Sequence, residues 1–443
     1  MKGAVRRPTN ILELDENMNI KKQYLKECAQ YIPSCSQTLS KNPNQYVIGV
    51  TPVAVARANG CYFWDMEGKK YLDMVLALGP MILGYANKRI DRMVKKQIES
   101  GTIFSLPSPK ELELARLLKE VVPCAEMSRF LMNGNEATTG AVRLARYITG
   151  RNHIAKCGYH GFQDWSICNK EGRNSGVPAL IKTLTHDFVY NNVASLEKIF
   201  NDYHSQIAAV IMEPVSSDKP QGRFLEKVKA AAHKNGAILI FDEMITGFRW
   251  ALGGAQEYFN VVPDLACFGK AVANGYPISI IAGKAEFMKR MDEIFVSTTF
   301  GGFVPSVVAS IETIKVMKEF GDVQQHLHQM GDYLIKEGNR ICFEDRLPVK
   351  FVGYGPHPVM KINIPDDYEA RVWKTFIYQE MNKAGILFNS SIMMSYSHKK
   401  EQINLILQEF SKIAKKLSTI GKVKGLEKLL KGEVVAPRTV RAV

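Results

Sequence analysis

The chain has 443 residues, of which 46% are hydrophobic, so it can bury a large core and divide into two or three lobes. No apolar run is long enough to span a membrane, and residues 1–20 lack the apolar centre of a signal peptide, so we expect a cytoplasmic protein. The eight cysteines form no CxxC pair and do not cluster with histidines, so we expect neither a metal site nor a disulfide framework.

The formal net charge is +14, and half of this excess lies near the C-terminus. From Ser411 to Val443 there are nine Lys or Arg residues against two Glu, a net of +7. No basic stripe is interleaved with aromatic residues, as single-strand binders require, so a solvated tail explains the charge better than a nucleic-acid or membrane surface. We therefore expect no nucleic-acid or membrane partner.

The middle of the chain alternates short apolar runs with helical or loop stretches, a pattern typical of an α/β fold with a mostly parallel sheet covered by helices. We expect an N-terminal arm with part of a small domain at 1–60, a large domain at 61–314, a small α+β domain at 315–420 that begins with a long amphipathic helix, and a basic tail at 421–443. The runs expected to be strands are RFLM (129–132), HIAKC (153–157), IAAVIM (207–212), AILIF (237–241), LACF (265–268) and SIIA (279–282).

Polar motifs follow several of these runs, at the sheet edge where α/β folds bind ligands. In MNGNEATTGAVRLARYITG, either Asn133 or Asn135 can cap a helix that ends before Gly150. The free amides at such a helix start suit a phosphate, and Gly134 would let the backbone approach it closely. An ordinary capped helix has the same pattern.

Two further motifs also allow either a ligand-binding or a purely structural interpretation. In CGYHGFQDW, Tyr159 could stack on a flat ring while His160 and Gly161 shape the turn beneath it, or the tyrosine could belong to the core. In VSTTFGG, Thr298 and Thr299 suit a second phosphate contact or a flexible loop.

Asp242 and Lys270 end two neighbouring apolar runs, in AILIFDEMITGFR and PDLACFGKAVANGYP. A pyridoxal phosphate (PLP) enzyme needs these two residue types: a lysine that forms a Schiff base with the cofactor aldehyde, and a carboxylate that keeps the pyridine nitrogen protonated. The pair therefore indicates PLP chemistry.

In this order, NGNEAT, YHG, MEP, FDEMITGFR, FGKAVANGYP and STTFGG resemble the class III, fold type I PLP-dependent aminotransferases, and most of all the branch of glutamate-1-semialdehyde aminomutase. The resemblance extends over nearly the whole chain. It implies a fold type I transferase with a large domain built on a sheet of about seven strands, and a homodimer whose active sites are shared between subunits.

The resemblance implies that Lys270 is the Schiff-base lysine and also moves the proton during transfer. Asp242 would hold the pyridinium nitrogen, and Thr299 would reach the phosphate of the neighbouring subunit. Glu213 would form a polar wall beside the substrate, and Arg249 could orient an anionic group or be a buried structural arginine. The implied cofactor-binding residues are Gly134, Asn135, Tyr159, His160, Asp242, Met244, Lys270 and Thr299.

Departures from the aminomutase pattern concern the substrate more than the reaction. Met244 replaces the usual valine and keeps an apolar contact. The N-terminal IPSCSQTLSKNPNQY offers Gln37, Ser40 and Lys41 where aminomutases place an arginine for the substrate carboxylate. This variant N-terminal segment and the C-terminal tail look similar to relatives that accompany surface-glycan synthesis.

We therefore predict transfer of an amino group from an amino acid such as L-glutamate to an aldehyde or ketone destined for a glycan. An intramolecular aminomutase uses the same lysine and aspartate and is the alternative; a decarboxylase is more distant. A catalytically idle regulator with this fold would have lost the lysine or the aspartate, and both are present.

Overall fold

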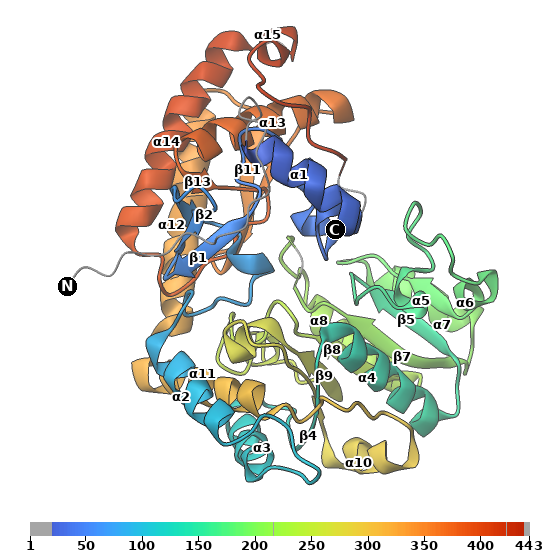
Figure 1. Cartoon of the computed structure of the whole chain (residues 1–443). Helices are drawn as coiled ribbons and strands as arrows, with labels where there is room; N and C mark the ends of the chain where they lie inside the picture. The colour runs from blue at the N-terminus through green and yellow to red at the C-terminus, as the bar shows by residue number, and fades with distance from the viewer. Residues whose placement is uncertain (1–19, 216, 422, 438–443) are drawn as a thin grey trace.

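The computed structural model describes residues 20–215, 217–421 and 423–437. In Figure 1 the N-terminal and C-terminal parts lie together on one side, and the middle of the chain lies on the other side around a seven-stranded sheet. Strand β10 is antiparallel to both of its neighbours, β4 and β9. Strands β9, β8, β7, β5 and β6 follow one another across the sheet, and each is parallel to the next. The expected mostly parallel α/β fold is confirmed. The strand order is β4 (Met127–Leu131), β10 (Ser279–Gly283), β9 (Leu265–Phe268), β8 (Ile238–Asp242), β7 (Ile207–Met212), β5 (His153–Cys157) and β6 (Thr185–Asp187).

Both faces of this sheet are buried, which explains why its strands are continuous apolar runs. In β7, Ala209 and Ile211 pack with helix α4 (Gly134–Thr149). The alternate residues Val210 and Met212 pack on the opposite face, with α7 (Val193–Asp202) and α8 (Phe224–Lys234). The carboxyl ends of the parallel strands then face the N-terminal and C-terminal part of the molecule (Figure 1).

A second sheet joins the two ends of the chain. Its order is β1 (Val55–Asn59), β2 (Tyr62–Asp65), β3 (Lys70–Asp73) and β13 (Ile386–Leu387), with β13 parallel to β3. A boundary at residue 60 would cut through this sheet, so the small domain takes more of the N-terminal segment than the sequence indicated. Strands β11 (Val349–Tyr354) and β12 (His357–Ile362) form a separate hairpin.

The boundary expected at residue 315 falls inside a helix. Helix α11 (Val304–Phe320) is buried along most of its length against α2 (Lys88–Glu99) and α3 (Pro109–Val121). A helix that is apolar on all sides gives no amphipathic period, so the sequence did not locate its start. Helix α12 (Val323–Glu344) follows and is the amphipathic one.

The described part of the basic C-terminal segment is docked, although Lys424, Lys428 and Lys431 are exposed as expected. Helix α15 (Val423–Glu427) leads into residues 428–437, which we call the strap. The Gln379 side chain of α13 (Asp367–Lys383) binds the backbone of Leu429 and Lys431, and Val435 is only 2% exposed. These three lysines are solvated, but the backbone of residues 423–437 is not a free tail; Lys422, Arg438 and Arg441 lie outside the described residues.

The remaining helices connect these layers. Within the described ranges no helix is both long and apolar enough to cross a membrane. The helices that connect the layers are α1 (Ile20–Tyr31), η1 (Pro33–Cys35), η2 (Leu39–Lys41), η3 (Pro43–Gln45), η4 (Leu76–Leu78), α5 (Asp164–Ile167), α6 (Ala179–Thr183), α9 (Ala255–Tyr258), η5 (Lys270–Ala273), α10 (Ala285–Met288), η6 (Lys289–Glu293) and α14 (Lys400–Ile420).

Candidate active site

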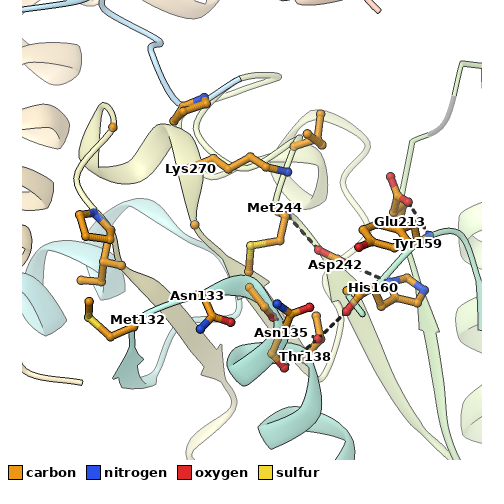
Figure 2. Close-up of a pocket in the computed structure, with 18 of the residues that line it drawn as sticks. Met132, Asn133, Asn135, Thr138, Tyr159, His160, Glu213, Asp242, Met244 and Lys270 are labelled. Carbon is orange, nitrogen blue, oxygen red and sulfur yellow. Dashed lines mark hydrogen bonds and ion pairs between the residues drawn. The ribbon is translucent and has the colours of Figure 1, made fainter. Parts of the chain in front are cut away.

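A cavity of about 350 Å³ opens at the carboxyl ends of the central strands (Figure 2). It brings together eight of the ten site residues expected from the sequence. Those eight are Gly134, Asn135, Tyr159, His160, Glu213, Asp242, Met244 and Lys270.

One side of the cavity is the first turn of α4. The side-chain oxygen of Asn133 accepts a hydrogen bond from the Glu136 amide at 3.2 Å, so Asn133 rather than Asn135 is the N-cap. Gly134 and Asn135 are then the first helical residues, whose amides have no acceptor within the helix. The turn therefore presents a partial positive charge to an anion in the cavity.

The Asn135 side chain holds the neighbouring loop against this turn. Its Oδ1 accepts from the Phe162 amide at 2.8 Å. A Cβ atom at Gly161 would lie 1.9 Å from that oxygen, and Gly161 has φ +110°, so only glycine fits. The glycine of the YHG motif thus allows the loop that carries Tyr159 to lie directly on the helix start.

Asp242 ends β8 and is 4% exposed. Its Oδ1 accepts from the Met244 amide at 3.1 Å, and its Oδ2 lies 2.8 Å from Nδ1 of His160 (Figure 2). His160 Nε2 is buried and has no hydrogen-bond partner among the described residues. An unpaired buried N–H is costly. We therefore infer the neutral tautomer in which the hydrogen is on Nδ1, so that the Nδ1–H group donates a hydrogen bond to Asp242. The carboxylate is therefore fixed in direction by two hydrogen bonds.

Two more hydrogen bonds position the loop around His160. The Thr138 hydroxyl donates to the His160 carbonyl at 2.8 Å, and Oε1 of Glu213 accepts from the Tyr159 amide at 2.7 Å. Tyr159 itself is 37% exposed and lines the cavity. These contacts support a flat ligand ring between Tyr159 and the apolar Met244 side.

Lys270 begins η5, immediately after β9. Its backbone has φ +47°, a conformation that non-glycine residues rarely adopt and that is often found at functional sites. The preceding Gly269 packs closely on Met244, since a Cβ atom there would lie 2.8 Å from the Met244 sulfur. This backbone directs the Lys270 side chain into the cavity, on the same side as Asp242 (Figure 2).

The other two expected residues lie outside this cavity. Arg249 is 1% exposed and donates to the carbonyl oxygens of Met394, at 2.6 Å, and Gly79. Burial lowers its pKa to about 10, so it stays a cation whose charge is held by backbone carbonyls. Of the two alternatives, this geometry favours the buried structural arginine. Thr299 is exposed and does not line the cavity of its own chain.

Sequence reasoning missed several residues of the cavity wall. Thr138 lies four residues after Gly134, on the same face of α4, and this spacing could have indicated it. Gly275, Tyr276 and Pro277 belong to the NGYP part of a quoted motif but were given no role, and Ile278 follows that motif directly. Met132 and Pro80 come from other strands and turns, and their approach depends on the tertiary fold.

The sequence profile described as aminotransferase class-III matches residues 46–414, which is most of the chain. The chain belongs to the class III aminotransferases. It is 36% identical to a glutamate-1-semialdehyde 2,1-aminomutase of Methanococcus maripaludis over 69% of this chain and 74% of that protein. It is 35% identical to a 3-aminobutyryl-CoA aminotransferase of Cloacimonas acidaminovorans over 77% of this chain and 82% of that protein.

Solved structures agree on the fold. A transaminase with PLP bound matches 91% of this chain and 99% of its own length with a TM-score of 0.82, at 21% sequence identity. The fold type I expectation and the resemblance to the aminomutase branch are confirmed. The enzyme is PLP-dependent, as its family is, and the cavity has the donor set for this cofactor: an amine, a fixed carboxylate, the amides of a helix start and an aromatic ring.

Proposed function

We propose that this enzyme is an aminotransferase that moves an amino group from L-glutamate to an aldehyde or ketone. The observation that carries the proposal is the convergence of Lys270, Asp242 and the start of α4 in one cavity. Bound PLP supplies an electron sink for the carbon that carries the transferred amino group. The reaction then needs one amine to move a proton and one carboxylate to hold positive charge on the cofactor ring.

We assign these tasks residue by residue. Lys270 would attach the resting cofactor and then carry the proton that leaves the substrate carbon. Asp242 would keep the ring nitrogen protonated, because an adjacent buried carboxylate stabilises the cationic form. Gly134 and Asn135 would bind the phosphate, and Tyr159 and Met244 would pack on the ring. Glu213 closes the substrate side, where its carboxylate is already held by the Tyr159 amide.

His160 is the positioning residue of this group, because its N–H fixes the Asp242 carboxylate. We expect His160→Ala to lower the single-turnover rate about tenfold, by analogy with the partners that orient metal ligands. His160→Asn keeps an N–H donor near the same position and should restore most of the rate. The checks are single-turnover absorbance and its pH profile for both variants. Equal losses in the two variants would mean that ring packing, rather than the hydrogen bond to Asp242, is what matters.

We further propose a homodimer in which Thr299 of one subunit completes the phosphate site of the other. The exposure of Thr299 and its distance from the cavity of its own chain are compatible with this role. A cytoplasmic location and an acceptor destined for a surface glycan stay predictions from the sequence.

An intramolecular aminomutase is the second candidate, because curated relatives such as that of Methanococcus maripaludis carry this name. The two reactions separate in a half-reaction. We expect L-glutamate to convert the yellow enzyme to the pyridoxamine form and release stoichiometric 2-oxoglutarate, as followed by absorbance and by assay of the keto acid. If no common amino donor converts the enzyme and glutamate-1-semialdehyde is isomerised, the aminomutase is the correct assignment.

A further inference from the structure

The cysteines of this chain differ in their access to solvent. All eight lie within the described ranges and carry free thiols, and Cys35 is the one among these eight that is not buried. Reactive cysteines are partly accessible, whereas buried structural cysteines are inert. A thiol reagent in solution is therefore expected to reach Cys35 first.

The Cys35 thiol lies against helix α1, beside Cys28. Its Sγ donates to the Leu25 carbonyl oxygen at 3.6 Å. Leu25 precedes Cys28 by three residues, so both lie on one face of the helix, and the Cα–Cβ bond of Cys28 is tilted back toward the turn of Leu25. The Cys28 thiol is also in hydrogen-bonding contact with the Cys35 thiol. The two sulfur atoms are therefore neighbours, as a disulfide requires.

The backbone between the two cysteines is folded into a compact loop. The Ile32 amide donates to the Cys28 carbonyl at 2.8 Å, and the Cys35 amide donates to the Ile32 carbonyl at 3.0 Å. Ser34 and Cys35 have φ of +59° and +51°, a conformation that residues other than glycine rarely adopt. Such strain persists only where the surrounding structure imposes it, and it is concentrated at functional sites. This turn holds the Cys35 thiol against α1.

A second pair of neighbouring cysteines, Cys124 and Cys267, lies in the core of the large domain. Their exposed fractions are 1% and 0%, and burial raises the pKa of Cys124 to about 12. Neither thiol is open to a reagent in solution. The pair of α1 and η1 is therefore the one that combines a neighbouring thiol with access to solvent.

We propose that Cys28 and Cys35 form a redox modification site, at which a small disulfide such as oxidised glutathione converts the two thiols to an intramolecular disulfide. The exposed Cys35 thiolate attacks one sulfur of oxidised glutathione, and one molecule of glutathione leaves. The buried Cys28 then attacks the Cys35 sulfur of this mixed disulfide and displaces the second glutathione. Two protein thiols are thus oxidised while one oxidised glutathione is reduced to two thiols.

The disulfide would tie the end of α1 to η1, where Cys35 now contacts the helix through its thiol alone. Neither cysteine lines the catalytic cavity, so this inference goes beyond the proposed aminotransferase function and does not depend on it. In a reducing compartment the pair stays reduced, and the bond forms only under oxidation.

The test incubates the reduced, purified holoenzyme with oxidised glutathione and follows its mass. We expect the native chain to lose two hydrogen atoms, about 2 Da, and dithiothreitol to restore them. Trypsin cleaves after Lys26 and Lys41, so one peptide, residues 27–41, contains both cysteines and should carry the whole change. A chain that stays reduced at residues 27–41, or that keeps glutathione on Cys35 without closing the disulfide, would overturn the proposal.

Two serine variants separate the roles of the two thiols. Cys28→Ser should stop at the mixed disulfide and keep one glutathione per chain, on Cys35. Cys35→Ser should neither bind glutathione in this peptide nor form the disulfide. Cys342→Ala, which removes a buried cysteine of α12, is the matched control and should react as the native chain does. Glutathione on Cys28 in Cys35→Ser, at the rate of the native reaction, would contradict the assignment of Cys35 as the attacked thiol.

A measurement on the native chain avoids any effect of substitution on folding. One equivalent of iodoacetamide should label Cys35 before the other cysteines, and the labelled enzyme should no longer form the disulfide. First labelling at another cysteine, or a disulfide in residues 27–41 after Cys35 is alkylated, would overturn the proposal. Because mass is the readout, either result holds whether or not the aminotransferase assignment is correct.

Discussion

Lys270→Ala is expected to lower turnover by about a thousandfold or more, because the variant loses the residue that we propose both attaches the cofactor and moves the proton. No other lysine is among the residues that line the catalytic cavity in the described part of the chain. The measurements are steady-state rate and the visible absorbance of the purified protein, which should change together. The Gly269 turn and the strand before Lys270 stay intact, so we expect the variant to fold.

Two comparisons make this prediction specific. Lys289→Ala removes an exposed lysine from η6 and should leave both turnover and colour unchanged. Added methylamine should restore part of the Lys270→Ala rate, because a free amine can enter the space and accept the proton. Turnover near the native level in Lys270→Ala, or a rate that methylamine cannot raise in a correctly folded variant, would contradict the assignment.

The central sheet could be predicted because its strands are buried on both faces and read as short apolar runs. The runs at 153–157, 207–212 and 265–268 match the bounds of β5, β7 and β9. The short edge strand β6 was not predicted, since its three residues THD carry no apolar signal. The helix α11 was not predicted either, because burial on all sides removes the period that marks a helix.

The candidate site was predictable where one residue type implies one chemistry. Lys270 and Asp242 follow strands that neighbour each other in the sheet, so sequence order and the α/β pattern were enough to bring them together. The partner of Asp242 was not predictable, because His160 is 82 residues earlier and meets it only through the packing of the YHG loop. For Arg249 the sequence left two roles open, and only its contacts with two carbonyls favour one.

The packing of the two chain ends lies outside what local sequence can indicate. The Ala436 amide donates to the Asn44 carbonyl at 2.9 Å, although these residues come from opposite ends of the chain. A composition argument placed the C-terminal charge in a solvated tail, which is correct for the described lysine side chains but not for the backbone beneath them. Motifs thus indicate the type of chemistry, whereas the arrangement of the chain ends depends on long-range packing.

Asp242→Asn is expected to retain the cofactor but to lower the single-turnover rate by about a hundredfold or more. Asparagine has the same shape, and its oxygen can still accept from the Met244 amide. It has no negative charge to keep the ring nitrogen protonated, so the electron sink is lost, and its amide nitrogen takes the place of the oxygen that faces Nδ1 of His160. The measurement is rapid-mixing absorbance after addition of the amino donor, with bound cofactor determined in parallel. An unchanged rate would refute the role of Asp242.

A comparison with Glu213→Gln decides whether the position of the Asp242 carboxylate or the total negative charge of the cavity is responsible for the lower rate. Both changes remove one carboxylate from the same cavity, and the glutamine oxygen can still accept from the Tyr159 amide. Glu213 binds the Tyr159 amide, whereas Asp242 faces His160, so the loss of the Glu213 charge should alter the apparent affinity for the donor more than the rate at saturation. If Glu213→Gln slows the saturated rate as much as Asp242→Asn, a general loss of negative charge explains both. A large difference instead assigns the electrostatic role to the one carboxylate that His160 and the Met244 amide hold in a fixed direction.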